Sequence, residues 1–408
     1  MLVPYSGCGE TDKFAEYYTA RGEIALAKEN LLPITAQALS RNSTQVCSHF
    51  GLHPNTRNLQ RLYNAGDALW VANAGNLDEP ITKSEYDSKT KRRPAQLFAH
   101  NTQTKIAQNL DARMSSRTDG VLGRMMDAFG DVGIRTNSYS IAGAGATVLE
   151  PEVSTPFDVL GSTGVTRLAG AHAALVPGIK NLTSHASRSP FANMWSSLVG
   201  TTLNRTDELA EVLTAVTLNQ PFAATATAVT SRIGAQFEQV AKLIKANQDS
   251  FSNEREAYYV QLGGFDVHAD AIDKMELLMN DMDLALASFE AEMKSQGLWN
   301  NVTIVQGSEF GRTISSNGDG SDHAWGGNYW LAGGAVRGGQ ILGQFPEDLT
   351  EEGMLNLGRG RMIPTTSWDQ IWNGVGAWFG VSESAMREVL PRRDNFPNLF
   401  TEEDLFSG

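Results

Sequence analysis

The sequence predicts an α/β fold with a mostly parallel central sheet. The clearest sign is a strand, a long amphipathic helix and a second strand that follow one another between residues 258 and 305. A second sign is a short helix that leads directly into an apolar strand near residue 70. Parallel strands need a crossover connection, usually a helix, so this order favours βαβ units with right-handed crossovers.

Composition narrows the possible classes. The chain has 408 residues, 41% hydrophobic and 19% charged, which is enough for a sizeable core in one large domain or two ordinary ones. Its net charge of -13 argues against a nucleic-acid partner. No stretch is long and apolar enough to span a membrane, and no signal-peptide pattern follows Met1. We interpret the basic run at residues 89–93 as a solvated loop.

The first half of the chain alternates between regular and irregular segments. Residues 54–66 predict a helix, with a proline at the start and a glycine at the end. Residues 68–72 predict a buried strand, whereas residues 76–120 are polar and read as irregular. Residues 121–130 predict another helix. Residues 140–200, rich in Gly, Ser, Thr and Pro, receive no assignment.

The second half carries the strongest periodicity. Residues 206–250 have helical patterns, and residues 365–382 predict one more amphipathic helix. Between residues 271 and 297, apolar side chains recur every three or four positions, and Gly297 is expected to end this helix. The β-branched run at 302–305 then predicts a buried strand.

Three polar clusters follow the expected strand ends. Asp266 and His268 come after the first strand of the βαβ unit, Glu309 follows the second, and Asp322 and His323 lie in a glycine-rich loop. In parallel sheets, ligands bind beyond the carboxyl ends of the strands. If the two strands are neighbours, these loops converge and could hold a metal ion through carboxylate and imidazole groups.

The alternative is a purely structural role for each cluster. Asp266 would cap the following helix, Glu309 would pair with Arg312, and the histidines would pack. Arg312 is otherwise a candidate clamp for sulfate, phosphate or carboxylate. His100, expected in a polar loop, is a candidate substrate contact or proton donor. The glycine patterns match no dinucleotide or P-loop motif.

One serine and two cysteines are further candidates for a functional role. Ser308 does not stand in a Gly-x-Ser-x-Gly elbow, since Gln306 and Phe310 occupy the glycine positions, so a hydrolase triad is disfavoured. Cys8 and Cys47 could pair, but two cysteines make no disulfide framework, and they exclude a four-cysteine zinc site.

Several motifs together resemble the DUF1501 family, which is placed in the alkaline phosphatase and sulfatase superfamily. They are "GLHPNTRNLQRLYNAGDALWVANAG", "LFAHNTQ", "GGFDVHAD", "GLWNNVTIVQGSEFGRT" and "GSDHAWGGNYWLAGGAVRGGQILGQFP", spread over nearly the whole chain. The resemblance implies an alkaline phosphatase-like three-layer α/β/α sandwich. It also implies one domain over residues 1–408, with a mainly helical or irregular insert around 140–250.

The chain departs from the superfamily pattern at two places. Sulfatase-like enzymes have Ser-Asp-His-Gly where this chain has residues 308–311, "SEFG", and Phe310 cannot bind a metal. The chain also starts with "MLVPYSGCGE", which resembles the segment just after a Gly-Gly-x-Asp motif of the family. We therefore expect the first central strand and its acidic residue to be missing, either through a truncated gene model or in a shortened paralogue.

The resemblance implies a metal-dependent hydrolase of phosphate or sulfate esters, with a small anionic ester as substrate. Asp266, His268 and His323 would hold a divalent metal, with zinc or calcium expected, and Glu309 and Asp322 would complete or orient the site. Arg312 would clamp the anion and His100 would assist proton transfer. Export to the periplasm or outside the cell is implied by the family. The alternative is a non-catalytic or truncated protein that binds a metal or a glycan.

Overall fold

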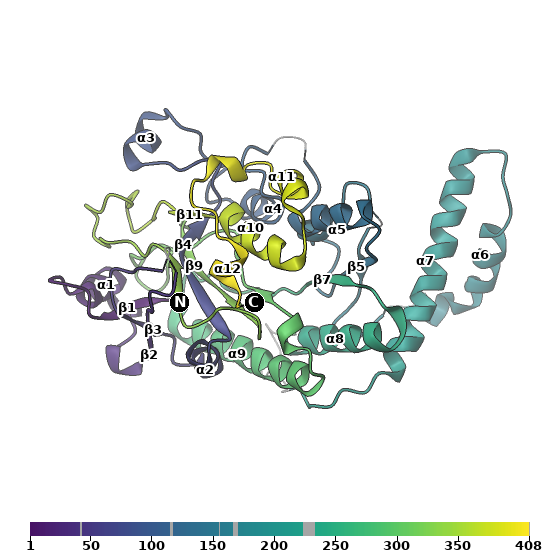
Figure 1. The fold of residues 1–408 in the computed structure, drawn as a ribbon, viewed down its shortest axis with the longest axis horizontal. Helices are drawn as coiled ribbons and strands as arrows, with labels where there is room; N and C mark the ends of the chain where they lie inside the picture. Colours follow the sequence, from purple (N-terminus) through teal and green to yellow (C-terminus); the bar gives the residue numbers. More distant parts are fainter. Residues whose placement is uncertain (41–42, 115–116, 155, 166–169, 223–232, 408) are drawn as a thin grey trace.

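The protein has a mixed α/β architecture (Figure 1). The computed structural model describes residues 1–408 apart from 41–42, 115–116, 155, 166–169, 223–232 and 408. The strands are β1 (Val3–Ser6), β2 (Leu32–Thr35), β3 (His49–Leu52), β4 (Ala68–Gly75), β5 (Thr136–Ser140), β6 (Asp158–Val159), β7 (Arg255–Tyr259), β8 (Ile304–Val305), β9 (Gly327–Ala332), β10 (Ile341–Gly343) and β11 (Thr366–Ser367).

The strands form three sheets in the described part of the chain, with orders β1-β3-β2, β10-β4-β9-β8 and β6-β5-β7. Strand β4 pairs in parallel with β10 and β11 but antiparallel with β9, which in turn pairs antiparallel with β8. The sheet around β4 is therefore mixed, and the expectation of a mostly parallel central sheet was too simple.

The strands of the expected βαβ unit are not neighbours. Strand β7 pairs in parallel with β5, whereas β8 belongs to the sheet around β4. Within the described residues, β7 and β8 each end their sheet. Residues of both strands line one large cavity of about 1300 Å³. The loops after β7 and β8 consequently meet across this cavity and not through paired strands.

Strand β4 is buried along its whole length, and its side chains alternate between two core clusters. Trp70 belongs to the same cluster as Phe289, which lies on a long helix on one side of the sheet. Val71 belongs to the same cluster as Ile371, from a helix near the C-terminus. Helices thus cover both faces of the sheet around β4.

The helices agree with most of the sequence-based expectations. They are α1 (Lys13–Arg21), α2 (Arg57–Ala65), α3 (Lys83–Ser88), α4 (His100–Asn109), α5 (Val121–Asp131), α6 (Val176–Thr183), α7 (Pro190–Ala215), α8 (Ile233–Ala246), α9 (Ala271–Ser295), α10 (Trp368–Phe379), α11 (Glu383–Val389) and α12 (Glu402–Leu405). Helices α2, α5, α8, α9 and α10 confirm expected helices. The region 76–120 was expected to be irregular, but it contains α3 and α4, because polar helices lack the apolar period that marks a core-facing one.

Helices α6 and α7 stand away from the rest of the molecule (Figure 1). The first turns of α7 expose a row of apolar side chains at helical spacing: Phe191, Met194, Trp195 and Leu198, each at least 60% exposed. In this arm, α6 and the first part of α7 fall in the segment 140–200 that the sequence left unassigned, whereas the end of α7 falls in 206–250, where helical patterns were expected. Among the described residues, no helix is long and apolar enough to cross a membrane.

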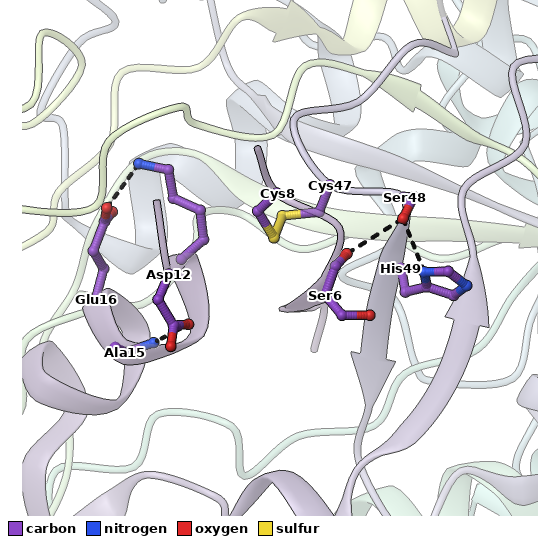
Figure 2. The surroundings of a disulfide bond; sticks show 9 residues. Ser6, Cys8, Asp12, Ala15, Glu16, Cys47, Ser48 and His49 are labelled. Atoms are coloured by element: carbon purple, nitrogen blue, oxygen red, sulfur yellow. Dashed lines mark hydrogen bonds and ion pairs between the residues drawn. A yellow bond between two sulfur atoms is a disulfide. The ribbon is translucent and has the colours of Figure 1, made fainter. Parts of the chain in front are cut away.

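Cys8 and Cys47 form a disulfide that ties the segment after β1 to the start of β3 (Figure 2). Cys47 is almost completely buried, and the adjacent Ser48 hydroxyl lies 2.9 Å from Nδ1 of His49. The two cysteines are 39 positions apart in the sequence. The pairing that the sequence left open is therefore present, and it closes a long loop.

Loss of the disulfide should destabilise the protein. Closing a loop of this length removes entropy from the unfolded chain, worth about 4 kcal/mol at most. We expect the double variant Cys8→Ser/Cys47→Ser to lower the free energy of unfolding by about 2–4 kcal/mol, as measured by urea denaturation. Reductant should destabilise the wild type similarly and leave the variant unaffected. An equal effect of reductant on both would contradict this assignment.

Candidate metal centre

Four separate segments bring the candidate residues together. The loop after β7 supplies Asp266 and His268, and the loop after β8 supplies Glu309 and Arg312. The loop before β9 supplies Asp322 and His323. His100 comes from elsewhere, because it is the first residue of α4 and not part of a loop.

Backbone hydrogen bonds hold the second and third of these segments side by side. Gly311 N–H donates to the carbonyl of Trp325 at 3.0 Å, and Ala324 N–H donates back to the carbonyl of Gly311 at 2.9 Å. Position 311 must be glycine, since a Cβ there would lie 2.0 Å from the carbonyl oxygen of Gly326. This close pairing fixes Arg312 opposite His323.

Asp266 is the centre of the cluster. Its carboxylate oxygens lie 2.8 Å from Nε2 of His268, 3.0 Å from Nε2 of His323 and 3.2 Å from Nε2 of His100. It also accepts a hydrogen bond from Arg312. Desolvation raises the pKa of this carboxyl, but the Arg312 and His323 hydrogen bonds outweigh it and lower the pKa to about 2.

Each of the three histidines is anchored through Nδ1. The Nδ1 of His323 lies 2.8 Å from the carbonyl oxygen of Phe98, which can only accept a hydrogen bond. The Nδ1 of His100 lies 2.7 Å from a carboxylate oxygen of Glu309, and that of His268 lies 3.2 Å from Asp322. A proton on Nδ1 of each ring would leave its Nε2 free to bind a metal in place of the contact with Asp266.

The Nε2 atoms of His100 and His268 both lie close to that of His323. Nε2 of His323 lies 3.1 Å from Nε2 of His100 and 3.3 Å from Nε2 of His268. Two lone pairs at this distance repel unless a proton or a metal ion lies between them. Neighbouring nitrogens of a tetrahedral zinc site, with Zn–N bonds of about 2.0–2.1 Å, lie about 3.3 Å apart. The spacing therefore fits ligands of one metal ion.

The tightest group consists of His100, Asp266 and His323, whose potential ligand atoms all lie within 4.8 Å of one another. His268 stands beside this group, close to Asp266 and His323. A set of three ligands with a further basic side chain alongside is typical of catalytic metal sites, which keep one coordination position open.

Residues 210–353 match the DUF1501 family. The description of that family is "Protein of unknown function (DUF1501)". The DUF1501 match supports the family indicated by the motifs, and it includes every candidate site residue except His100. It covers less than half of the chain. Among curated proteins, no relative matches the chain.

Glu309 and Asp322 each contact the Nδ1 atom of a histidine. Glu309 contacts His100 and also accepts a hydrogen bond from Ser308 Oγ at 2.9 Å. Asp322 contacts His268 and pairs with Arg359 at 2.5 Å. Both acids thus orient imidazoles in the described geometry, as carboxylates commonly do around metal-binding histidines.

The structural alternatives for Asp266 and Glu309 do not match these contacts. The residue that precedes α9 is Asp270, and no side-chain hydrogen bond caps the helix there. Arg312 pairs with Asp266, and its other hydrogen bonds go to the carbonyls of Val267 and Ser321 and to the Ser321 hydroxyl. Arg312 therefore ties the loop after β7 to the loop before β9.

Three contributors were not anticipated from the sequence. The carbonyl of Phe98 fixes His323, Arg359 holds Asp322, and the buried ring of Phe310 lies 4.7 Å from the His323 ring and 4.8 Å from the His100 ring. Phe310 packs as an apolar wall against these two imidazoles. Only Phe310 was visible in the motif, where it appeared as a departure.

Proposed function

We propose that this protein is a metal-dependent hydrolase of phosphate or sulfate esters, of the alkaline phosphatase-like class. The observation that carries the proposal is the convergence of three Nε2 atoms and the Asp266 carboxylate, with each Nδ1 fixed by an acceptor. Such an arrangement holds the imidazoles in the tautomer that a metal requires. The helices on both faces of the sheet around β4 support the three-layer sandwich that this class has.

His100, Asp266 and His323 would hold the metal. Nitrogen-rich ligand sets favour zinc over calcium, which prefers oxygen ligands only. A divalent metal at this position would polarise an ester oxygen and lower the pKa of a bound water. His268 lies beside these residues and is half exposed, so it can pass a proton to or from the substrate, while Asp322 orients its ring.

Arg312 contributes a fixed positive charge next to the cluster. Its donors are used by Asp266 and two carbonyls, and its side chain is 21% exposed. We assign it a positioning role on Asp266, together with electrostatic attraction of an anionic ester. We also propose export from the cytoplasm, since the Cys8–Cys47 disulfide persists most readily in an oxidising compartment.

The first test is metal content by elemental mass spectrometry, followed by turnover of aryl phosphate and aryl sulfate esters. We expect about one zinc per chain and ester hydrolysis that is lost in Asp266→Asn, because the amide cannot supply the negative charge. The matched control is Asp270→Asn, an identical change four residues away at an exposed left-handed position that Asn tolerates well. Metal-loaded, folded wild type without turnover on either ester would rule out the hydrolase.

A non-catalytic metal-binding protein is the second candidate. It is favoured by Ser308, whose hydroxyl donates a hydrogen bond to Glu309 and does not stand in a Gly-x-Ser-x-Gly elbow. Bound metal without turnover of either ester would support this second candidate.

A further inference from the structure

A basic recess lies on the surface next to the metal centre. It is lined by five cationic side chains, two aromatic rings and no carboxylate. The residues of this basic recess used below are Lys89, Lys91, Arg92, Arg93, Arg113, Tyr86 and Phe98. Its cations come from two separate segments, since Arg113 joins the run at residues 89–93 only through the fold. The chain as a whole has 33 basic and 46 acidic side chains, so this gathering runs against its overall charge.

The cations of the recess are only partly neutralised. Lys91 lies 3.3 Å from Glu85, and Arg113 lies 2.8 Å from the buried Asp78. Arg93 stacks over the ring of Tyr86, with 4.8 Å between the guanidinium carbon and the ring centre. In the described parts of the chain, no ion pair involves Lys89 or Arg92. Uncompensated like charges repel one another, and a bound anion would relieve this repulsion.

The recess and the metal centre lie on either side of the backbone segment around Phe98. Phe98 lines the recess, and its carbonyl accepts the hydrogen bond from His323. His100 follows two residues later, a backbone distance of at most about 7 Å. Arg361 lies over the Phe98 ring at 5.3 Å and donates to the His323 carbonyl at 3.2 Å. One molecule could therefore reach both places.

The backbone of this segment also has unusual φ angles. Gln96 and Phe98 have positive φ angles of 43° and 74°, which residues with side chains rarely adopt. Such conformations persist only where the surroundings enforce them, and they gather at ligand-binding sites. The loop is thus held in shape, which a merely solvated run of charges does not require.

We propose that the basic recess binds a second anionic group of the substrate, so that the preferred substrate carries at least two sulfate or phosphate groups. This inference rests on the proposed function, because the ester to be cleaved would lie at the metal centre. Arg and Lys side chains bind both anions through charge-assisted hydrogen bonds, so a sulfated glycan and a polyphosphorylated molecule share the required chemistry.

Calorimetry with three defined probes would test the recess. The probes are a heparin-derived hexasaccharide, inorganic tripolyphosphate and an uncharged hexasaccharide. We expect salt-sensitive binding of at least one anionic probe and none of the uncharged sugar. The anionic probe that binds more tightly identifies the source. Absence of binding to both anionic probes by folded wild type would overturn the proposal.

Charge reversal locates the binding. We expect Lys89→Glu/Arg92→Glu to weaken binding of the anionic probe by at least tenfold. The matched control Arg135→Glu/Lys242→Glu makes the same charge change on side chains outside the recess, and it should weaken binding less than twofold. Equal losses in both variants would mean non-specific attraction and refute the recess. Thermal melting of both variants verifies that they fold.

The two proposals can fail separately. The probes are bound in this experiment and need not be hydrolysed. If the protein binds a probe through the recess but cleaves no ester, the anion-binding proposal stands and the hydrolase proposal is wrong. Cleavage of simple aryl esters without probe binding would do the opposite.

Discussion

Replacing His323 with alanine should weaken the affinity for zinc by more than about 100-fold, the largest change expected from any single substitution at the site. His323 is the one imidazole within 3.3 Å of both other Nε2 atoms, and it also contacts Asp266. Its removal therefore deletes a ligand and separates the remaining ones. Zinc affinity can be measured by competition with a chromogenic chelator.

Glu309→Gln should lower zinc affinity less than His323→Ala does. The variant keeps its shape but no longer places a carboxylate against Nδ1 of His100, so we expect zinc affinity to fall by about 10- to 100-fold. His185→Ala removes an exposed histidine from the α6–α7 arm and serves as the unaffected control. Stoichiometric zinc retained by His323→Ala would place the metal elsewhere and remove the main support for the proposed function.

The residues of the site could be predicted better than their roles. Asp266, His268, Asp322 and His323 became candidates because three acid and imidazole clusters fall in loops near the expected strand ends. Their mutual distances depend on backbone pairing between residues far apart in the chain. His100 was placed among substrate contacts, because no pattern near "LFAHNTQ" reveals that α4 points its first residue at Asp266.

The sheet arrangement shows a second limit. The helix α9 was clear from its apolar period, and a helix between two strands usually joins parallel neighbours. Here β7 and β8 have other partners, and β8 is only two residues long. Hydrophobic period indicates that a segment is a buried strand, but it does not specify the strand with which it pairs. The convergence of the loops was therefore expected for a reason that does not hold.

The local sequence also does not reveal that the carboxyl group of Asp369 is buried. Asp369 stands in the first turn of α10, where an ionised carboxylate is ordinarily favoured by the helix dipole. In the structure it is 3% exposed, and one of its carboxylate oxygens has no hydrogen-bond partner. Burial raises its pKa to about 7, against the opposing effect of Arg392 and Arg124, while the nearby Asp78 adds to the rise. The dipole contributes about 1 kcal/mol, too little to offset this desolvation.

Asp369→Asn should remove a pH-dependent loss of stability. The folded protein holds the Asp369 proton up to about pH 7, whereas an unfolded aspartate releases it near pH 4. Between these values the folded state binds more protons, so this group makes stability fall as pH rises, by up to about 4 kcal/mol, and has no further effect above pH 7. The neutral amide avoids this cost. We expect the variant to gain on the wild type steadily from pH 4 to pH 7 in urea denaturation.

Other groups titrate in the same pH range. The test of Asp369 is therefore the difference in free energy of unfolding between Asp369→Asn and the wild type. Glu256 is partly buried, with its pKa raised to about 7 by desolvation, and it contributes a similar slope to wild type and variant alike. Asp394→Asn, an exposed change on the partner of Arg387, should show no such trend. A constant difference between Asp369→Asn and wild type from pH 4 to pH 7 would mean that Asp369 is ionised in the folded protein. Arg392 and Arg124 would then outweigh its burial.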